Sequence, residues 1–439
     1  MRSLLSVTGM LARGGTPAER ARARLLAAGA ALATWFLFGA ANMLALRGHL
    51  DERLGPASQP GTRGGAAFAL VLLVLPVAAF LYQSSRLASA DRERRLTALR
   101  LAGATPSQVR LLGMAETTRA ALIGTVTGAA TYLLLQWAAR RLLLDPRSPA
   151  DVGVPPLLCA AAMAIVIAAA AVSGLLAGRH VVATPLSVTV RANRRPPRRY
   201  PIALLVAGLL LIVSWPVLPF SLRYFAPLAG AVILVAGLLL SPSSVIWLSA
   251  RATGRRARSA ETLLAARALE ADARPWGRAL SVVGLTVAIG SVTGWFEADM
   301  LEARRATETF FLSSFILIDL ALLVGMAVAA SALFVHHAEH FLERGPVLAT
   351  LRATGTPETA LRRVLVRQAL IAAIPVCVIA ALPGLLMPGI RLRLDLWSLW
   401  PLARALLMAA LGVLAAVLSA ALSRRRLRRT ISPVLLRTE

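Results

Sequence analysis

The chain contains no lysine, and all 48 of its basic residues are arginine. A GxxxxGK[ST] phosphate-binding loop requires a lysine that contacts the β- and γ-phosphates, so ATP hydrolysis by that route is excluded. Cysteine is also scarce. Cys159 and Cys377 each fall inside an apolar run, where they build neither a disulfide framework nor a CxxC metal site. We expect both to be small core residues, and we expect no metal and no cofactor in this chain.

Acidic residues are few as well: 21 against 48 arginines, which gives a formal net charge of +27. Such a charge can indicate binding to nucleic acid, but its distribution argues against that function. The polar stretches between apolar runs alternate between arginine-rich and arginine-poor, at about three to one, as the positive-inside rule describes. The charge therefore predicts a membrane topology with both termini in the cytoplasm, and no nucleic-acid partner.

Apolar sequence dominates what remains. Hydrophobic residues make up 57% of the chain, the mean hydropathy is +0.68, and several runs are long enough to cross a bilayer. We predict an all-α polytopic membrane protein with about ten transmembrane helices in contact with the lipid bilayer. The expected spans are 26–46, 67–85, 116–136, 156–178, 202–218, 224–248, 279–295, 313–335, 367–386 and 404–422.

A charged sequence segment occurs twice, at 91–116 and at 343–368. Laid over each other without a gap, the two segments match at Leu99/Leu351, Arg100/Arg352, Gly103/Gly355 and Arg110/Arg362. Gly103 is a suitable helix terminator, Thr105 a suitable N-cap and Pro106 a suitable first-turn residue. The second copy repeats this order with Gly355, Thr356 and Pro357. Each copy therefore predicts a helix, a tight elbow and a second helix. An ordinary basic loop is the alternative for one copy, but two equivalent copies favour a function.

The repeat divides the chain into three parts. Residues 1–178 form a first four-span repeat, 179–250 a basic connector and a two-span hairpin, and 251–439 a second four-span repeat. Because two spans are inserted, both repeats have the same orientation, which makes them parallel. Within the connector at 251–278, residues 259–272 predict an amphipathic helix on the membrane surface, with Leu263, Leu264, Ala268 and Leu269 on one face.

The strings LTALRLAGATPSQVRLL (96–112) and LATLRATGTPETALRRVL (348–365) resemble the elbow of the FtsX-like permeases of ABC transporters, the MacB-, LolC- and BceB-type proteins. The four-two-four arrangement of spans is most similar to the BceB branch or to the duplicated permeases of Gram-positive bacteria. Two features depart from the family pattern. Arg95 and Val347 stand where the family usually has an acidic residue, and the outer loops are too short for an extracellular domain.

The resemblance implies two parallel FtsX-like repeats whose elbows dock on a separate ATPase, which would carry the ATP and Mg²⁺. Two ATPase copies per chain are expected, in a bacterial cell membrane, and the chain itself is not expected to be an enzyme. The implied docking residues are Arg95, Leu99, Arg100, Gly103, Thr105, Pro106, Arg110, Leu351, Arg352, Gly355, Thr356, Pro357 and Arg362.

Asp319 is the acidic residue that lies well inside an expected span, so it is a candidate intramembrane polar site. It has two interpretations: it lines a substrate route or pairs with Arg304, Arg305 or Arg391, or its carboxylate reaches the outer headgroups. His336 and His340 are four residues apart, but no further metal ligand accompanies them. Gly124 and Gly128 form a GxxxG pattern, which favours close helix packing.

The preferred function is a permease subunit that couples ATP hydrolysis on a partner to export or extraction of a lipid, peptide or drug-like substrate. An ion-coupled secondary transporter with internal repeats is the alternative. That class usually has matching charges in both repeats, whereas Ala67 stands at the position equivalent to Asp319. A membrane enzyme lacks support, because no catalytic pair or metal cluster is evident.

Overall fold

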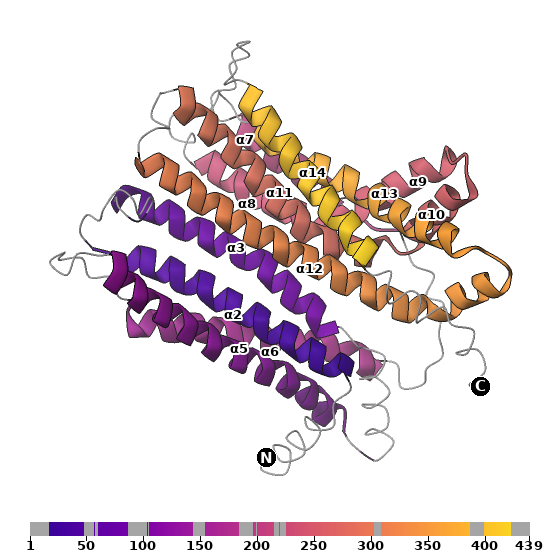
Figure 1. Ribbon diagram of the computed structural model, residues 1–439, viewed down its shortest axis with the longest axis horizontal. Coiled ribbons are helices and arrows are strands. Elements are labelled where there is room, and N and C mark those ends of the chain that lie inside the picture. The colour runs from indigo at the N-terminus through magenta and orange to yellow at the C-terminus, as the bar shows by residue number, and fades with distance from the viewer. Residues whose placement is uncertain are drawn as a thin grey trace. The chain divides into compact units, whose positions relative to one another are not determined.

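A computed structural model describes residues 17–47, 57, 60–86, 103, 105–143, 154–183, 196–198, 200–214, 219, 225–302, 309–386 and 399–422. Across these ranges the regular secondary structure is helical, without a strand (Figure 1). The chain divides into two compact units, Met1–Ala192 and Asn193–Glu439.

The first unit contains four long helices. They are α2 (Pro17–Ala45), α3 (Pro60–Arg86), α5 (Pro106–Leu143) and α6 (Pro156–Ala183). Helix α2 packs against the other three, α6 also packs against α3 and α5, and apolar side chains such as Phe38 and Ala129 fill the interior. Each of these helices carries one expected span, because a helix satisfies its own backbone hydrogen bonds in an apolar medium.

The GxxxG pattern in α5 lies in the contact with α2. A Cβ atom added to Gly124 would overlap the backbone of Ala27, and one added to Gly128 would lie 2.7 Å from the Cα atom of Ala31. The two helix backbones therefore touch where neither glycine has a side chain. This confirms the close packing expected from the sequence.

The second unit contains four more long helices. They are α11 (Ala273–Glu302), α12 (Thr309–Ala353), α13 (Glu358–Leu385) and α14 (Trp400–Leu422). Helix α11 packs against the other three, and α14 also packs against α12 and α13. The same pairs of helices pack together as in the first unit when α11, α12, α13 and α14 are matched to α2, α3, α5 and α6. Two stretches of sequence about 250 residues apart therefore form helix sets with the same internal neighbours.

Four shorter helices precede that set. They are α7 (Tyr200–Val213), α8 (Phe225–Leu240), α9 (Pro242–Arg255) and α10 (Ala260–Ala271). Helices α7 and α8 form the expected hairpin. The expected span 224–248 consists of two helices, because the chain bends by 52° between α8 and α9, where Pro242 begins the new helix. A proline is compatible with the first turn of a helix but not with a continuous one.

Helix α10 forms where the amphipathic helix was predicted, but it buries a different face. Ala265, Ala266 and Leu269 are buried against α9 and α13, whereas Leu263 and Leu264 are each 43% exposed. The predicted apolar face of Leu263, Leu264, Ala268 and Leu269 is therefore divided: Leu269 is buried in the protein, and Leu263 and Leu264 are not. Small alanine side chains allow α10 to approach its neighbours closely, and the two larger leucines are left outside this contact.

Seven helices among the described residues are long and apolar enough to cross a membrane, and the bent pair of α8 and α9 would add an eighth. They lie in α2, α5, α6, α11, α12, α13 and α14. Helix α7 is apolar but has only 14 residues. Of the two cysteines, Cys377 is fully buried as expected, and Cys159 is half-buried.

Candidate functional site

The second elbow joins α12 to α13. Helix α12 ends at Ala353, and Gly355 follows with a φ angle of +93°. This left-handed conformation costs a side-chain-bearing residue roughly 1–2 kcal/mol, so glycine suits it. The position of Gly355 as helix terminator agrees with the sequence prediction.

Helix α13 begins one residue later than predicted. Its N-cap is Pro357, which has extended backbone angles (φ −69°, ψ 145°), and Thr356 makes no cap. The Pro357 carbonyl accepts hydrogen bonds from the backbone N–H groups of Ala360 (3.0 Å) and Leu361 (3.3 Å). The expectation that Thr356 caps the helix with Pro357 in its first turn is therefore wrong. The reason is that the second copy is one residue shorter between its glycine and its proline.

The first elbow has the same glycine geometry and a stronger cap. Gly103 has a φ angle of +96°. The backbone N–H of Gln108 donates to Thr105 Oγ1 (3.3 Å), and the backbone N–H of Thr105 donates to Gln108 Oε1 (2.9 Å). This reciprocal pair is a capping box, and Pro106 occupies the first position of α5 as predicted.

A Cβ atom added to either Gly103 or Gly355 would meet nothing within 4 Å. Both glycines are therefore needed for their φ angles and not for space. Among the described glycines, these two are the ones with a positive φ. The two elbows thus share one backbone device, although their N-caps differ.

Several predicted docking residues carry no side-chain description. Arg95, Leu99 and Arg100 lie outside the described residues, and Leu351, Arg352, Pro106 and Arg110 are described only as helical backbone. Arg362 is described: its guanidinium forms an ion pair with Glu358 one helical turn earlier. The structure therefore locates the elbows but leaves their contact surface as a prediction.

Helix α10 is bound to the first turns of α13. Arg367 Nη2 lies 2.9 Å from Glu261 Oε2, and Arg367 Nη1 donates to the hydroxyls of Ser259 and Thr262. Arg363 Nη1 lies 3.4 Å from Glu261 Oε1. Ser259 is also the N-cap of α10, so these contacts occur at the beginning of that helix. The basic connector is therefore attached to α13 within three turns of the second elbow.

In the first unit a buried arginine joins α2 to α5. Arg22 Nη1 lies 3.9 Å from Glu116 Oε2, and the Arg22 side chain is 6% exposed. Residues Arg274 and Gln368 stand 252 positions later, on α11 and α13. The same spacing separates Gly103 from Gly355. In each four-helix set, an arginine therefore stands at the equivalent position of the first helix and a polar residue at the equivalent position of the third helix.

The predicted intramembrane residue Asp319 pairs with Arg404. The Arg404 guanidinium reaches from α14 to the Asp319 carboxylate on α12, and its Nη2 also lies 3.5 Å from Glu297 Oε1 on α11. The indole N–H of Trp400 donates to Glu297 Oε2 (2.8 Å). The suggested partners Arg304, Arg305 and Arg391 lie outside the described residues. Arg404 was expected at the edge of a span, so the sequence did not reveal this cluster.

The cluster depends on a missing side chain on α11. A Cβ atom on Gly294 would lie 2.6 Å from both Cβ and Cγ of Arg404, so this glycine lets the arginine pass. Arg404 is 90% buried, Glu297 is 93% buried, and the Asp319 side chain is 46% exposed. Glu297 lies just past the expected end of its span, which is why it was overlooked. His336 and His337 each pack edge-on against Trp276.

Residues 67–186 match the protein family described as FtsX-like permease C-terminal. The matched segment includes most of α3, the first elbow glycine, α5 and all of α6. The chain carries an FtsX-like permease domain. The family match covers about a quarter of the chain, and the several long apolar helices of the described residues support a multi-pass membrane protein. No curated protein matches the chain.

The permease match ends before the second elbow. The part of the chain that contains Gly355 shares its geometry with the matched segment: a long helix, a left-handed glycine, and two further helices that pack together. Arg363, Arg367 and Glu261 were not predicted as part of a site. Their contacts join segments about 100 residues apart, which no local sequence signal indicates.

Proposed function

We propose that the chain is the permease subunit of an ABC transporter. It couples ATP hydrolysis on a separate ATPase to export or extraction of a lipid, peptide or drug-like substrate. The observation that carries this proposal is the pair of elbows, in which Gly103 and Gly355 share a left-handed conformation between helices. The family match at 67–186 supports it.

Each elbow contacts one ATPase subunit in this proposal, and closure of the ATPase pair pushes on both. The second elbow stands on α12, whose 45 residues give a length of about 67 Å, more than twice the hydrocarbon thickness of a bilayer. A continuous helix of this length transmits displacement along its axis. Asp319 of α12 holds Arg404 of α14, so movement of α12 acts on that neighbour.

The partner supplies the nucleotide chemistry. ATP and Mg²⁺ bind to the ATPase, because a chain without lysine offers no GxxxxGK[ST] loop. The architecture that we propose has about ten transmembrane helices, arranged as two parallel four-helix repeats with the α7–α8 hairpin between them. The shared order of helix pairs in the two units supports this arrangement.

A pull-down tests the docking surface. The chain is purified from membranes of its own cells, and the recovered nucleotide-binding subunit is quantified. Arg100→Glu with Arg352→Glu should reduce recovery at least tenfold, because each reversed charge opposes a contact of the elbow. Arg255→Glu with Arg256→Glu changes the same net charge at two exposed residues outside the elbows and should have no effect. Normal recovery with the elbow variant would disprove the docking assignment.

We place both termini and the two basic connectors in the cytoplasm of a bacterial cell, as the arginine distribution suggests. A single cysteine at Arg258 should then resist a membrane-impermeant thiol reagent in intact cells. One at Gly64, which is exposed near the beginning of α3, should react. Labelling of the Arg258→Cys variant from outside would reverse this orientation.

The ion-coupled transporter has one observation in its favour, the cluster of Asp319, Glu297 and Arg404 inside the second unit. Proton binding to one of its carboxylates would supply the coupling. The equivalent position of Asp319 in the first unit is the buried Ala67. Transport that persists with Asp319→Asn and a collapsed proton gradient, but stops without ATP, would exclude this alternative.

A further inference from the structure

A cleft lies between the beginning of α13 and the end of α14, with a volume of about 400 Å³. Its floor is apolar and includes Val366, Leu370 and Ala421, whereas Arg362, Arg363 and Arg367 line its polar side. An apolar groove with a cationic rim matches the chemistry of an amphiphile with a negative headgroup. It does not match a small hydrophilic ion, which would leave the floor unused.

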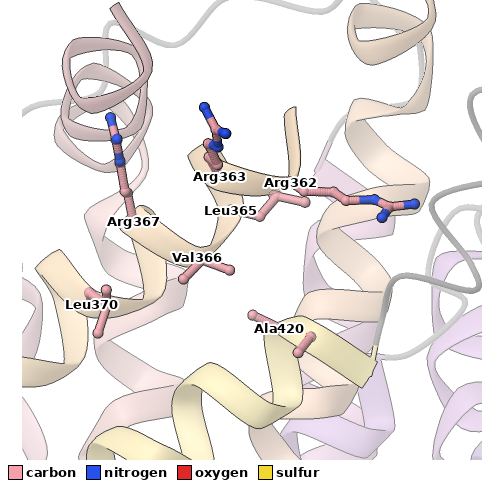
Figure 2. A pocket seen from close by; sticks show the side chains of 8 residues that line it. Arg362, Arg363, Leu365, Val366, Arg367, Leu370 and Ala420 are labelled. Atoms are coloured by element: carbon pink, nitrogen blue, oxygen red, sulfur yellow. The ribbon is translucent and has the colours of Figure 1, made fainter. Parts of the chain in front are cut away.

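Figure 2 shows how these side chains divide between floor and rim. Val366 points toward Ala420 on α14, across the hollow. Arg363 and Arg367 point to the side of α13 that is turned away from Ala420. The cleft therefore separates an apolar part between two helices from a charged part at its edge.

The arginines are only partly neutralised by their protein partners. Arg362 pairs with Glu358, yet its Nε is buried without a hydrogen-bond partner among the residues that the structure describes. Arg363 is 68% exposed, and its partner among the described residues is Glu261, at 3.4 Å. Glu261 is shared with Arg367. Three guanidinium groups thus face two carboxylates, which leaves the rim positive and leaves donors for an anion.

The cleft lies at the ends of two candidate membrane spans, which is the level of the lipid headgroups. Ala420 and Ala421 lie in the last turn of the α14 span (Trp400–Leu422), and the arginines lie in the first three turns of the α13 span (Glu358–Leu385). Both places are at the end of a membrane-crossing helix, where headgroups meet acyl chains. Basic pockets between transmembrane helices at the cytoplasmic surface bind anionic headgroups, and arginine binds phosphate oxygens in pairs.

We propose that this cleft binds one anionic phospholipid of the cytoplasmic leaflet, with an acyl chain on the apolar floor and the phosphate at Arg362 and Arg363. The choice of leaflet rests on the orientation given under Proposed function. The lipid phosphate lies within three turns of Gly355, so the second elbow and its following helix respond to the lipid composition of the membrane.

Native mass spectrometry of the purified full-length chain in detergent tests this site, with phosphatidylglycerol or phosphatidylcholine added at equal concentration. The chain should retain one phosphatidylglycerol in preference to phosphatidylcholine. Arg362→Ala with Arg363→Ala should weaken retention about tenfold, since each arginine near a phosphate contributes substantially. Ala421→Phe should also remove it, because the phenyl ring fills the floor while every arginine remains.

Arg255→Ala with Arg256→Ala is the matched control, since it removes two exposed arginines outside the cleft and should leave retention within twofold. Equal loss in this control would show adsorption by surface charge and overturn the site. Unchanged retention in Ala421→Phe, or displacement by millimolar inorganic phosphate, would also overturn it. If the arginine variant fails to fold, Ala421→Phe decides alone. No ATPase is present, so failure here leaves the docking result unaffected.

Discussion

Gly103 and Gly355 are the residues on which the functional argument depends most closely. Each adopts a left-handed conformation that other residues avoid, and each has open space where a side chain would stand. Substituting either glycine should therefore reduce stability through backbone strain. This effect can be separated from packing, which is the usual reason why a glycine is needed in a membrane protein.

Gly103→Ala and Gly355→Ala should each destabilise the folded chain by roughly 1 kcal/mol, because alanine is strained at a positive φ. Gly65→Ala is the matched control: this glycine lies in α3, has open space around it and has no positive φ. There alanine should stabilise by about 0.5–1 kcal/mol, since it favours helix. Thermal unfolding in detergent measures all three. Midpoint shifts of the same sign in elbow and control variants would contradict the role of φ.

At the scale of the helices, the most specific contact is the ion-pair cluster of Arg404, which connects α14 to α11 and α12. Arg404 is buried in this cluster and contacts carboxylates on both neighbours, while Gly294 provides the space for its side chain. Removing a buried partner leaves the remaining charges uncompensated, which costs more than the ion pair contributes. We therefore regard the cluster as the element that fixes α12 to α14.

Arg404→Ala should lower the unfolding midpoint more than Asp319→Ala, because Asp319 is half exposed and its loss leaves Arg404 with Glu297. The two substitutions should couple by on the order of 1 kcal/mol in a double-mutant cycle. Asp299 is exposed, and it lies two residues after Glu297 on α11, on the opposite side of the helix, so Arg404→Ala with Asp299→Ala should be additive. Additivity of Arg404→Ala with Asp319→Ala would show that the pair is not formed.

Helices and turns were predictable where the signal is local. Apolar runs and a glycine followed by threonine and proline act within one turn, so the helices of both units and the conformation of Gly103 and Gly355 follow from sequence. Partner choice was not predictable in the same way. Arg404 lies 85 residues from Asp319, and Arg367 lies 105 residues from Thr262. Such contacts depend on which helices become neighbours, and that decision is made by packing across the whole unit.

Two further differences between the predictions and the structure, at α10 and after α8, have separate causes. The buried face of α10 is set by α9 and α13, which take alanines and leave Leu263 and Leu264 outside. The bend after α8 had a local signal, Pro242, but hydropathy runs smoothly across it. The mean hydropathy of a segment therefore indicates whether it can lie in a membrane, but not whether its helix is straight.

At the scale of the whole molecule, the two units are related by one pattern of helix neighbours and one elbow conformation, offset by 252 residues at the glycines. Under the function that we propose, a single chain would present two docking elements, whereas a permease with one elbow would need a second copy. The elbows are not identical. Thr105 caps the first, Pro357 begins the second, and α10 is attached only beside the second among the described helices.

The mass of the complex isolated from its own membrane through a tag on this chain tests the central claim most directly. An ABC ATPase works as a pair of subunits, and this chain carries two elbows. Native mass spectrometry should therefore find one permease chain with two ATPase polypeptides, of one kind or of two related kinds. Two permease chains per ATPase pair, or a permease that is isolated without any ATPase, would contradict the account.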